Sequence, residues 1–348
     1  MGASEGANGA AGRAGEVAAA SAGGAGAGDA GCPRGEARRG AGEGAGQPES
    51  GLDWNRMWVE RFGCDPESDR DNEAYWDERA ESFGCHAASG APAPGGQRAD
   101  DDSRATTEPS PYAAEYLRLA GLRPGESAID MGCGTGSIAL PAAGEGHRVT
   151  ACDLSECMLA RLRARARAAG VADMVDARKL SWLGDWSGLP VADVFLASRS
   201  LYSCDLRATL LAMEAHARRR CCVTVATLDS PLHDRTMLEA IGRPMPRLSE
   251  HVYLFNLLAQ MGRLPEVSYI EHVKPTFGDT PQQVTAEFER DAGPMTDEER
   301  DRLARFVASR FDFDRRTPQG HPTRSYRQVV RWAFVAWDVP KRSEGVPA

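Results

Sequence analysis

AIDMGCGTGS, residues 128–137, is the stretch of this 348-residue chain that decides its fold. Apolar residues lead into Asp130, and three glycines then follow at alternate positions. Glycine adopts positive φ angles freely and carries no Cβ, so a loop of this composition can pass very close to a bulky ligand. The stretch therefore predicts a strand that ends in a ligand-binding loop.

The spacing of the glycines indicates which ligand the loop binds. A dinucleotide-binding loop, G-x-G-x-x-G, would need a glycine at position 137, where this chain has Ser137. The spacing G-x-G-x-G after an acidic strand end instead resembles motif I of the class I S-adenosylmethionine-dependent methyltransferases. The resemblance implies that the loop holds the methionine and ribose portions of the cofactor, with Asp130 near its amino group. The cofactor-binding residues that it implies here are Asp130, Gly132, Cys133, Gly134, Thr135 and Gly136.

A second motif stands at the distance that a βαβ unit requires. Residues 148–153, RVTACD, predict a short strand ending in Asp153, about twenty residues after the first glycine. A carboxylate there can accept hydrogen bonds from both ribose hydroxyls, although it could instead be a helix-capping or solvated acid. The continuation resembles the family pattern D-x-S-x-x-M-L, which implies that Ser155 caps the next helix and that Met158 lies against the adenine. Leu154 joins the cofactor-binding set.

Composition divides the chain before any motif is considered. Residues 1–50 are rich in Ala and Gly and cannot bury enough surface to offset the entropy of ordering, so we expect a disordered tail. Residues 51–86 are dense in aromatics and predict a helical lid, residues 87–107 a flexible linker, and residues 108–348 the methyltransferase domain. No targeting signal or membrane span is evident, which predicts a cytoplasmic protein.

Charge and cysteine content exclude several classes of function. A net charge of −9 argues against a large nucleic-acid footprint, and Arg161, Arg163, Arg165 and Arg167 are interpreted as the solvated side of a helix. Cys133, Cys152, Cys221 and Cys222 fall in predicted strands or at their ends, where free buried thiols are expected. The group Cys64, Cys85 and His86 is the one hint of a metal, and we interpret it as unrelated residues. We predict no metal site.

Strands and helices alternate through the middle of the chain. The pattern predicts an α/β fold with a doubly wound, parallel, Rossmann-like sheet and ligands at the carboxyl ends of its strands. The expected strands are 126–131, 148–153, 174–179, 191–198 and 220–228, and the expected helices are 71–83, 111–120, 137–143, 155–169 and 205–217.

The last third departs from this alternation. It predicts a helix over 251–262, strands over 267–273 and 328–337, and two helices starting at the capping boxes of Thr280 and Thr296. The second of these helices is expected to bury Leu303, Phe306, Val307 and Phe311. Class I methyltransferases end in an antiparallel strand pair, so the resemblance implies a seven-stranded sheet with residues 278–323 inserted before its last strand.

Methyl transfer from a sulfonium is a direct displacement, so alignment of the reactants can supply about 7–11 kcal/mol of the barrier without a catalytic triad. The strand that ends at Ser198 matches family motif IV, which faces the transferred methyl group. The chain has Ser198-Arg199-Ser200-Leu201 there, in place of Asn-Pro-Pro-Tyr, and it lacks the acidic ligands of magnesium-dependent relatives. Arg199 could bind an anionic group of the substrate or form a structural salt bridge.

Other candidates are assigned by position. Either Trp182 covers the adenine ring or Asp185 accepts a hydrogen bond from its amino group, and Trp182 could equally be core. Trp76 lies in a segment similar to the "Y/W-D-x-x-A" lid helix, where an aromatic ring could shield the sulfonium or simply pack in the core. The candidate catalytic residues are Arg199, Tyr202 and Trp76, with Tyr253, His251 and His272 as further candidate proton acceptors.

These features predict an S-adenosylmethionine-dependent methyltransferase that acts on a small molecule. The first alternative is a protein or RNA methyltransferase, which would need an open cleft with a positive rim. The second is a regulatory protein that binds S-adenosylmethionine without catalysis. A nicotinamide oxidoreductase is the least favoured because its glycine spacing differs. The methyl acceptor and the oligomeric state do not follow from the sequence.

Overall fold

The structure of the chain is a computed structural model. The described residues are 51–63, 72–82, 107–230, 234–245, 247–274, 278–318, 320, 322–326 and 328–341. The predicted tail of residues 1–50 and the metal hint at Cys64, Cys85 and His86 lie outside them, as does nearly all of the predicted linker.

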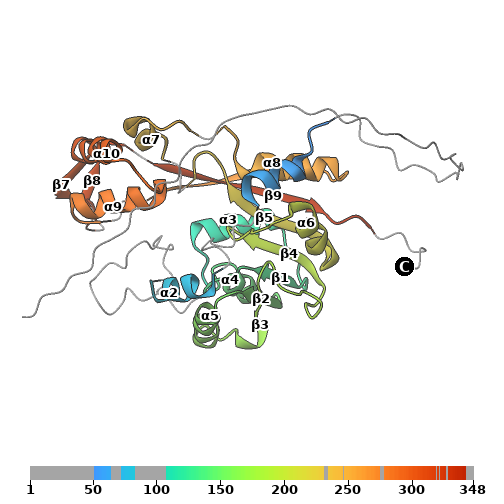
Figure 1. Cartoon of the computed structure of the whole chain (residues 1–348). Helices are drawn as coiled ribbons and strands as arrows, with labels where there is room; N and C mark the ends of the chain where they lie inside the picture. Colours follow the sequence, from blue (N-terminus) through green and yellow to red (C-terminus); the bar gives the residue numbers. More distant parts are fainter. Residues whose placement is uncertain are drawn as a thin grey trace, which may run out of the picture. The chain divides into compact units, whose positions relative to one another are not determined.

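A seven-stranded sheet of order β3-β2-β1-β4-β5-β9-β6 forms the centre of the described part of the chain (Figure 1). Its strands are β1 (Ala128–Met131), β2 (Val149–Asp153), β3 (Val175–Lys179), β4 (Ala192–Ser198), β5 (Ala217–Ala226), β6 (Glu266–Val273) and β9 (Val329–Asp338). Strands β1 to β5 run parallel, whereas β9 is antiparallel to both β5 and β6. The predicted doubly wound sheet with a terminal antiparallel pair is confirmed.

Helices cover both faces of this sheet. Helices α3 (Pro111–Ala120), α4 (Ala139–Gly144) and α5 (Glu156–Ala168) bury their apolar side chains on one face. Helices α1 (Trp54–Phe62), α6 (Leu206–Ala215) and α8 (Glu250–Gln260) do so on the other. Alternate strand residues supply the two cores: Phe195 and Ala197 face one, and Val194 and Leu196 face the other.

The inserted segment forms a third core. It contains α9 (Pro281–Ala292), α10 (Asp297–Arg310), β7 (Phe311–Arg316) and β8 (Pro322–Arg324), and it packs against α7 (Arg235–Ile241), which precedes α8. Strand β6 ends and β9 begins opposite one another, with Val273 paired to Val329. Because β9 is antiparallel to β5, the insertion connects to the sheet at the edge where the parallel strands end.

Several boundaries differ from the sequence predictions. The structure adds α7, β7, β8 and a short 3₁₀ turn at Ala172–Met174, and residues 54–62, expected only as part of a lid, form helix α1. Phe311 is buried but begins β7 instead of ending the preceding helix. Strand β5 starts at Ala217, not at residue 220, although its first residues include three arginines.

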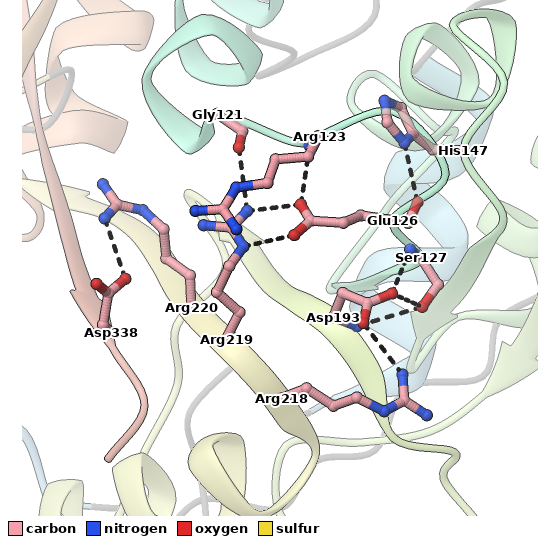
Figure 2. A network of polar contacts seen from close by, with 10 residues as sticks. All are labelled: Gly121, Arg123, Glu126, Ser127, His147, Asp193, Arg218, Arg219, Arg220 and Asp338. Carbon is pink, nitrogen blue, oxygen red and sulfur yellow. Dashed lines mark hydrogen bonds and ion pairs between the residues drawn. The ribbon is translucent and has the colours of Figure 1, made fainter. Parts of the chain in front are cut away.

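Ion pairs explain why β5 tolerates those arginines (Figure 2). Arg219 makes a bidentate pair with Glu126 at 2.6 Å, and Arg218 pairs with Asp193 at 3.4 Å. Arg220 is held by Glu266 at 2.7 Å and by Asp338 at 3.5 Å. These residues lie where the parallel strands begin, at the edge of the sheet opposite the glycine loop, so they brace the fold away from the predicted site.

Helix caps agree with the sequence except at one position. Ser110 accepts from the Ala113 amide, Gly121 ends α3 in the left-handed conformation, and Thr296 forms the complete capping box expected of it. Thr280 caps α9, but the Gln283 side chain accepts from the Asp279 amide, so the predicted box is incomplete. The capping prediction for Ser155 is confirmed by its 3.0 Å bond from the Met158 amide.

The described cysteines include both free thiols and a disulfide-bonded residue. Cys133, Cys152, Cys221 and Cys222 are free and buried as expected, whereas Cys204 is disulfide-bonded.

Among the described residues, no helix is long and apolar enough to cross a bilayer.

Candidate active site at the carboxyl ends of the strands

The three glycines of the 132–136 loop have different structural roles. All have positive φ: +71° at Gly132, +54° at Gly134 and +94° at Gly136. A Cβ on Gly132 would lie 2.3 Å from the Ser200 Cβ, and one on Gly136 would lie 2.3 Å from Leu162 Cδ1. A Cβ on Gly134 would meet no atom within 4 Å. Only Gly134 therefore leaves open space for a ligand, whereas the other two permit close packing within the protein.

A pair of alanine substitutions tests this division. We expect Gly136→Ala to destabilise the fold by about 2–4 kcal/mol, because backbone strain adds to overpacking against Leu162. Gly134→Ala should cost only about 1 kcal/mol, because its Cβ projects into open space. Urea unfolding of the two variants measures the difference. Equal losses of stability would contradict the packing role of Gly136.

Asp153 connects the end of β2 to the glycine loop. Its Oδ2 accepts from the Gly134 amide at 2.8 Å, and its Oδ1 accepts from the Ser155 amide at 2.9 Å. Burial raises the pKa of this carboxyl, and the hydrogen bonds from the Ser155 and Gly134 amides oppose the rise. The Leu154 amide acts in the same sense. An ionised carboxylate has about four lone-pair directions, so these three amides leave the half-buried side chain able to accept a further hydrogen bond from a ligand hydroxyl.

Asp130 is the buried acid of the site. It lies one residue before the end of β1 with 1% of its surface exposed, and its Oδ2 has no hydrogen-bond partner among the described residues. Burial, and then the charge of Asp153, raise the pKa of Asp130 to about 7. A buried acceptor without a partner is costly. A cationic ligand group placed beside it would relieve that cost.

Helix α2 (Glu73–Ser82) is fastened to the element that follows Asp153. The Asp77 carboxylate accepts from the Ser155 hydroxyl and from the Cys157 amide, and the Ser155 bond holds the pKa of Asp77 below its ordinary value. Lys179, at the end of β3, pairs with Glu73 at 2.6 Å. The Asp77 carboxylate thus links α2 to the N-terminal end of α5, which follows Asp153 in the chain.

The glycine loop is also braced from α5. The Arg165 guanidinium donates to the Thr135 carbonyl oxygen at 2.8 Å and to its hydroxyl at 3.1 Å. Arg163 pairs with Glu156 and donates to the Ala177 carbonyl oxygen. The prediction that these arginines form only a solvated face is therefore wrong for Arg163 and Arg165, because both reach polar groups of the sheet and its loops.

A polar array occupies the end of β4. The Tyr112 hydroxyl lies 3.0 Å from Ser198 Oγ and 2.7 Å from Thr224 Oγ1. Thr224 Oγ1 also accepts from the Arg199 amide at 2.9 Å. Arg199 has a φ of 58°, and its guanidinium carbon lies 4.2 Å from the centre of the Tyr112 ring. The expected Ser198 and Arg199 are thus joined to a tyrosine that the sequence analysis did not assign.

The adenine candidates after β3 have defined surroundings. Trp182 packs against Trp186 and Phe195 at ring distances of 5.6 and 6.5 Å, and its indole nitrogen is buried without a partner among the described residues. Asp185 is exposed and accepts from the amide and the hydroxyl of Ser187. Of the two, Trp182 is the partly buried residue, and its buried indole nitrogen has no hydrogen-bond acceptor among the described residues.

The remaining candidates are spread along this edge of the sheet. His251 lies 2.8 Å from Ser249 Oγ, and burial lowers its pKa, opposed by a hydrogen bond with the Ala226 backbone at the end of β5. The ring of Tyr253 packs among Trp54, Trp58 and Phe62 of α1, which places it in the core.

His272, Tyr202 and Trp76 lie on three different parts of the chain. His272 lies on β6, which β9 separates from β5. Tyr202 is half-buried after β4, and Trp76 is half-buried on α2 with its ring 5.2 Å from that of Tyr75. Two predicted cofactor residues follow Asp153 in the chain. Leu154 is half-buried, and Met158 is buried.

Sequence reasoning missed the residues that support the site from other elements. They are Asp77, Tyr112, Ser200, Thr224 and Trp332. Tyr112 lies in the first turn of the correctly predicted helix 111–120, but nothing in its local sequence indicates a contact with β4 and β5. Asp77 lies within the predicted lid motif, and its acidic side chain was the one local sign that this helix could accept hydrogen bonds from another element.

Comparison with known proteins identifies the class. Residues 128–221 match a family model described as a methyltransferase domain. An uncharacterized protein of Haemophilus influenzae is 32% identical over 235 residues, which cover 67% of this chain and 84% of that one. Among solved structures, precorrin-6y C5,15-methyltransferase from Geobacter metallireducens is 15% identical with a TM-score of 0.40, covering 68% of this chain and 95% of that one. Magnesium protoporphyrin IX methyltransferase from Synechocystis is 18% identical with a TM-score of 0.38, covering 66% and 80%.

The sequence match covers Asp130, Asp153 and the glycine loop, and the sheet has the seven strands and the final antiparallel pair that the family resemblance implied. The chain belongs to the class I S-adenosylmethionine-dependent methyltransferases.

Proposed function

We propose that this protein binds S-adenosylmethionine at the 130–136 loop and transfers its methyl group to a small-molecule acceptor. The observation that carries the proposal is the cradle formed by Gly134, Asp153 and Asp130 at adjoining strand ends. Gly134 leaves room for a ligand, Asp153 retains acceptor capacity, and Asp130 has an oxygen without a partner. These residues fit a ligand that carries a ribose diol and a cationic amino group.

The bound cofactor would supply an activated methyl group on a sulfonium. The chain's own residues have to bind and orient the reactants. Asp153 would accept hydrogen bonds from the ribose hydroxyls, and Asp130 would pair with the amino group in a buried setting where such a pair is strong. Alignment of this kind lowers the barrier without an acid–base dyad.

Two features favour a small acceptor over a macromolecule. The carboxylates of Asp77 and Asp153 lie near the α5 N-terminus and the glycine loop, which is unfavourable for a nucleic-acid phosphate backbone. The insertion joins the sheet at this same edge, where it would restrict access by a large substrate.

Calorimetric titration of the full-length protein tests the cofactor. Micromolar binding of S-adenosylmethionine and S-adenosylhomocysteine, with no binding of NAD, is expected. Release of S-adenosylhomocysteine is then measured with a panel of small molecules and, separately, with total RNA and unfractionated protein. Turnover only with the macromolecules would overturn the small-molecule assignment, and binding without turnover on any panel would favour the regulatory alternative.

The proposal also assigns a role to α2 as a latch over the cofactor. Asp77→Ala removes two hydrogen bonds to the first turn of α5, and we expect dissociation of S-adenosylhomocysteine to accelerate by about tenfold. Stopped-flow fluorescence measures the rate. Glu115→Ala is the matched control because that exposed carboxylate pairs only locally with Arg118. An unchanged rate in Asp77→Ala would show that α2 does not retain the cofactor.

A further inference from the structure

The backbone of Arg199 is held in an unusual conformation at the end of β4. It is the one non-glycine residue of the described chain with a positive φ, at 58°. A left-handed conformation costs a side-chain-bearing residue about 1–2 kcal/mol. Here the Arg199 amide donates to both the carbonyl oxygen and the hydroxyl of Thr224. The surroundings therefore fix the direction in which this side chain leaves the sheet, and strain of this kind concentrates at functional sites.

The Arg199 guanidinium rests on aromatic rings instead of a carboxylate. Its central carbon lies 4.2 Å from the Tyr112 ring centre and 5.9 Å from that of Trp332. The Tyr112 ring is itself fixed, because its hydroxyl is bonded to Ser198 and Thr224. Half-buried arginines elsewhere, such as Arg219 and Arg243, each make a bidentate pair with a glutamate.

Arg199 forms no ion pair with a carboxylate among the described residues. The structural salt bridge considered in the sequence analysis therefore does not hold its side chain in place. A stacked guanidinium keeps its planar fork of donors free for a ligand.

A second donor adjoins the guanidinium. The indole nitrogen of Trp332 is buried and has no hydrogen-bond partner among the described residues. Trp332 pairs with Ala226 at the carboxyl end of β5, and Ser200, one residue beyond Arg199, packs against Gly132 of the cofactor loop. The two donors therefore lie between the cofactor loop and the insertion, where a methyl acceptor would have to bind.

We propose that Arg199, with the Trp332 indole beside it, binds an oxyanion of the methyl acceptor, so that the substrates of this enzyme are carboxylates or phosphate esters. This inference rests on the proposed function for its location. Arg199 is a specificity-determining residue here: it holds the acid group while another part of the same molecule receives the methyl group. The polar array of Tyr112, Ser198 and Thr224 sets its position.

The test titrates simple anions into the full-length protein, with and without S-adenosylhomocysteine. The probes are benzoate, phenyl phosphate and the neutral benzamide. Binding is followed through the indole N–H resonance of Trp332, assigned by its loss in Trp332→Phe. We expect saturable shifts with one or both anions and none with benzamide, and the tighter anion identifies the acid group of the acceptor.

Three variants separate a binding role from a structural one. Arg199→Gly suits the positive φ and should keep the fold while weakening anion binding at least tenfold. Arg199→Lys keeps the charge but loses the planar fork, so its affinity should be intermediate. Arg167→Met, on the exposed side of α5, removes the same charge and should bind anions like the wild type.

Equal anion affinity in Arg199→Gly and wild type, or no saturable shift with either anion, would overturn the inference. Calorimetry of S-adenosylhomocysteine should be unchanged in all three variants. Failure of the wild type to bind S-adenosylhomocysteine would overturn the proposed function alone, because the anion titration without it still reports on Arg199. A loss of cofactor affinity in Arg199→Gly as large as that in an Asp153 variant would overturn the separation of the two sites.

Discussion

Replacing Asp153 with alanine is expected to weaken binding of S-adenosylhomocysteine by about 100-fold. The side chain would offer hydrogen bonds to two ribose hydroxyls, and a charged acceptor contributes about 1.5 kcal/mol or more to each. A loss of about 3 kcal/mol corresponds to that change in the dissociation constant. The same carboxylate holds the Gly134 and Ser155 amides, so the loop also loses its attachment to β2.

Calorimetry at constant pH measures the effect, and circular dichroism checks that the variant is folded. Asp185→Ala is the matched control, because its exposed carboxylate bonds only to Ser187. Asp153→Asn separates ligand binding from attachment of the loop. Its side-chain oxygen can still accept from one backbone amide, whereas its NH₂ group cannot accept a hydrogen bond at all. Affinities within twofold of wild type in both Asp153 variants would exclude this residue from the cofactor site.

Asp130 should make both stability and cofactor binding depend on pH. Its pKa in the folded protein is raised from 3.8 to about 7 by burial and by Asp153. Between pH 4 and pH 7 the folded chain therefore keeps a proton that the unfolded chain has lost. Stability from this group is complete below pH 4 and falls as the pH rises to 7, by on the order of 4 kcal/mol in total.

Comparison with Asp130→Asn isolates this contribution, because the other titrating groups are common to both proteins. We expect the variant to unfold at higher urea than wild type at pH 8, with the difference shrinking toward pH 4. A difference that does not vary with pH would show that Asp130 is ionised in the folded protein throughout this range.

Ligand binding should show the opposite dependence. A cationic amino group favours the charged carboxylate, so binding of S-adenosylhomocysteine releases a proton and weakens by up to about tenfold per pH unit below pH 7. Methylthioadenosine, which lacks the amino acid portion, is the control ligand and should bind independently of Asp130. Proton release is measured by calorimetry in buffers of different ionisation enthalpy. A similar pH dependence for the two ligands would place the amino group away from Asp130.

The order of strands and helices from residue 111 to the end of β5 could be predicted because each element carries its own signal. Short apolar runs marked the buried strands, and Ser110, Gly121 and Ser155 mark helix ends through local hydrogen bonds. The Asp153 contact with Gly134 was also accessible, because parallel strands bring their carboxyl ends together at one edge.

Other features depend on contacts between distant segments. The arginines at the start of β5 resemble a polar interruption in the sequence. The strand forms because carboxylates from three other strands and from the loop before β1 pair with them. The small strands β7 and β8 depend on pairing with each other and on the third core.

The sequence by itself determined the fold class, the family and the position of the acids and glycines of the proposed cofactor loop, because these depend on local spacing and on a sheet topology that spacing implies. Only the tertiary structure decided what each residue does there. It showed that Gly136 serves packing and Gly134 leaves open space, that Asp77 reaches α5, and that Arg199 stacks on Tyr112 and Trp332. Those contacts join residues many positions apart, and no local pattern encodes which side chains will meet.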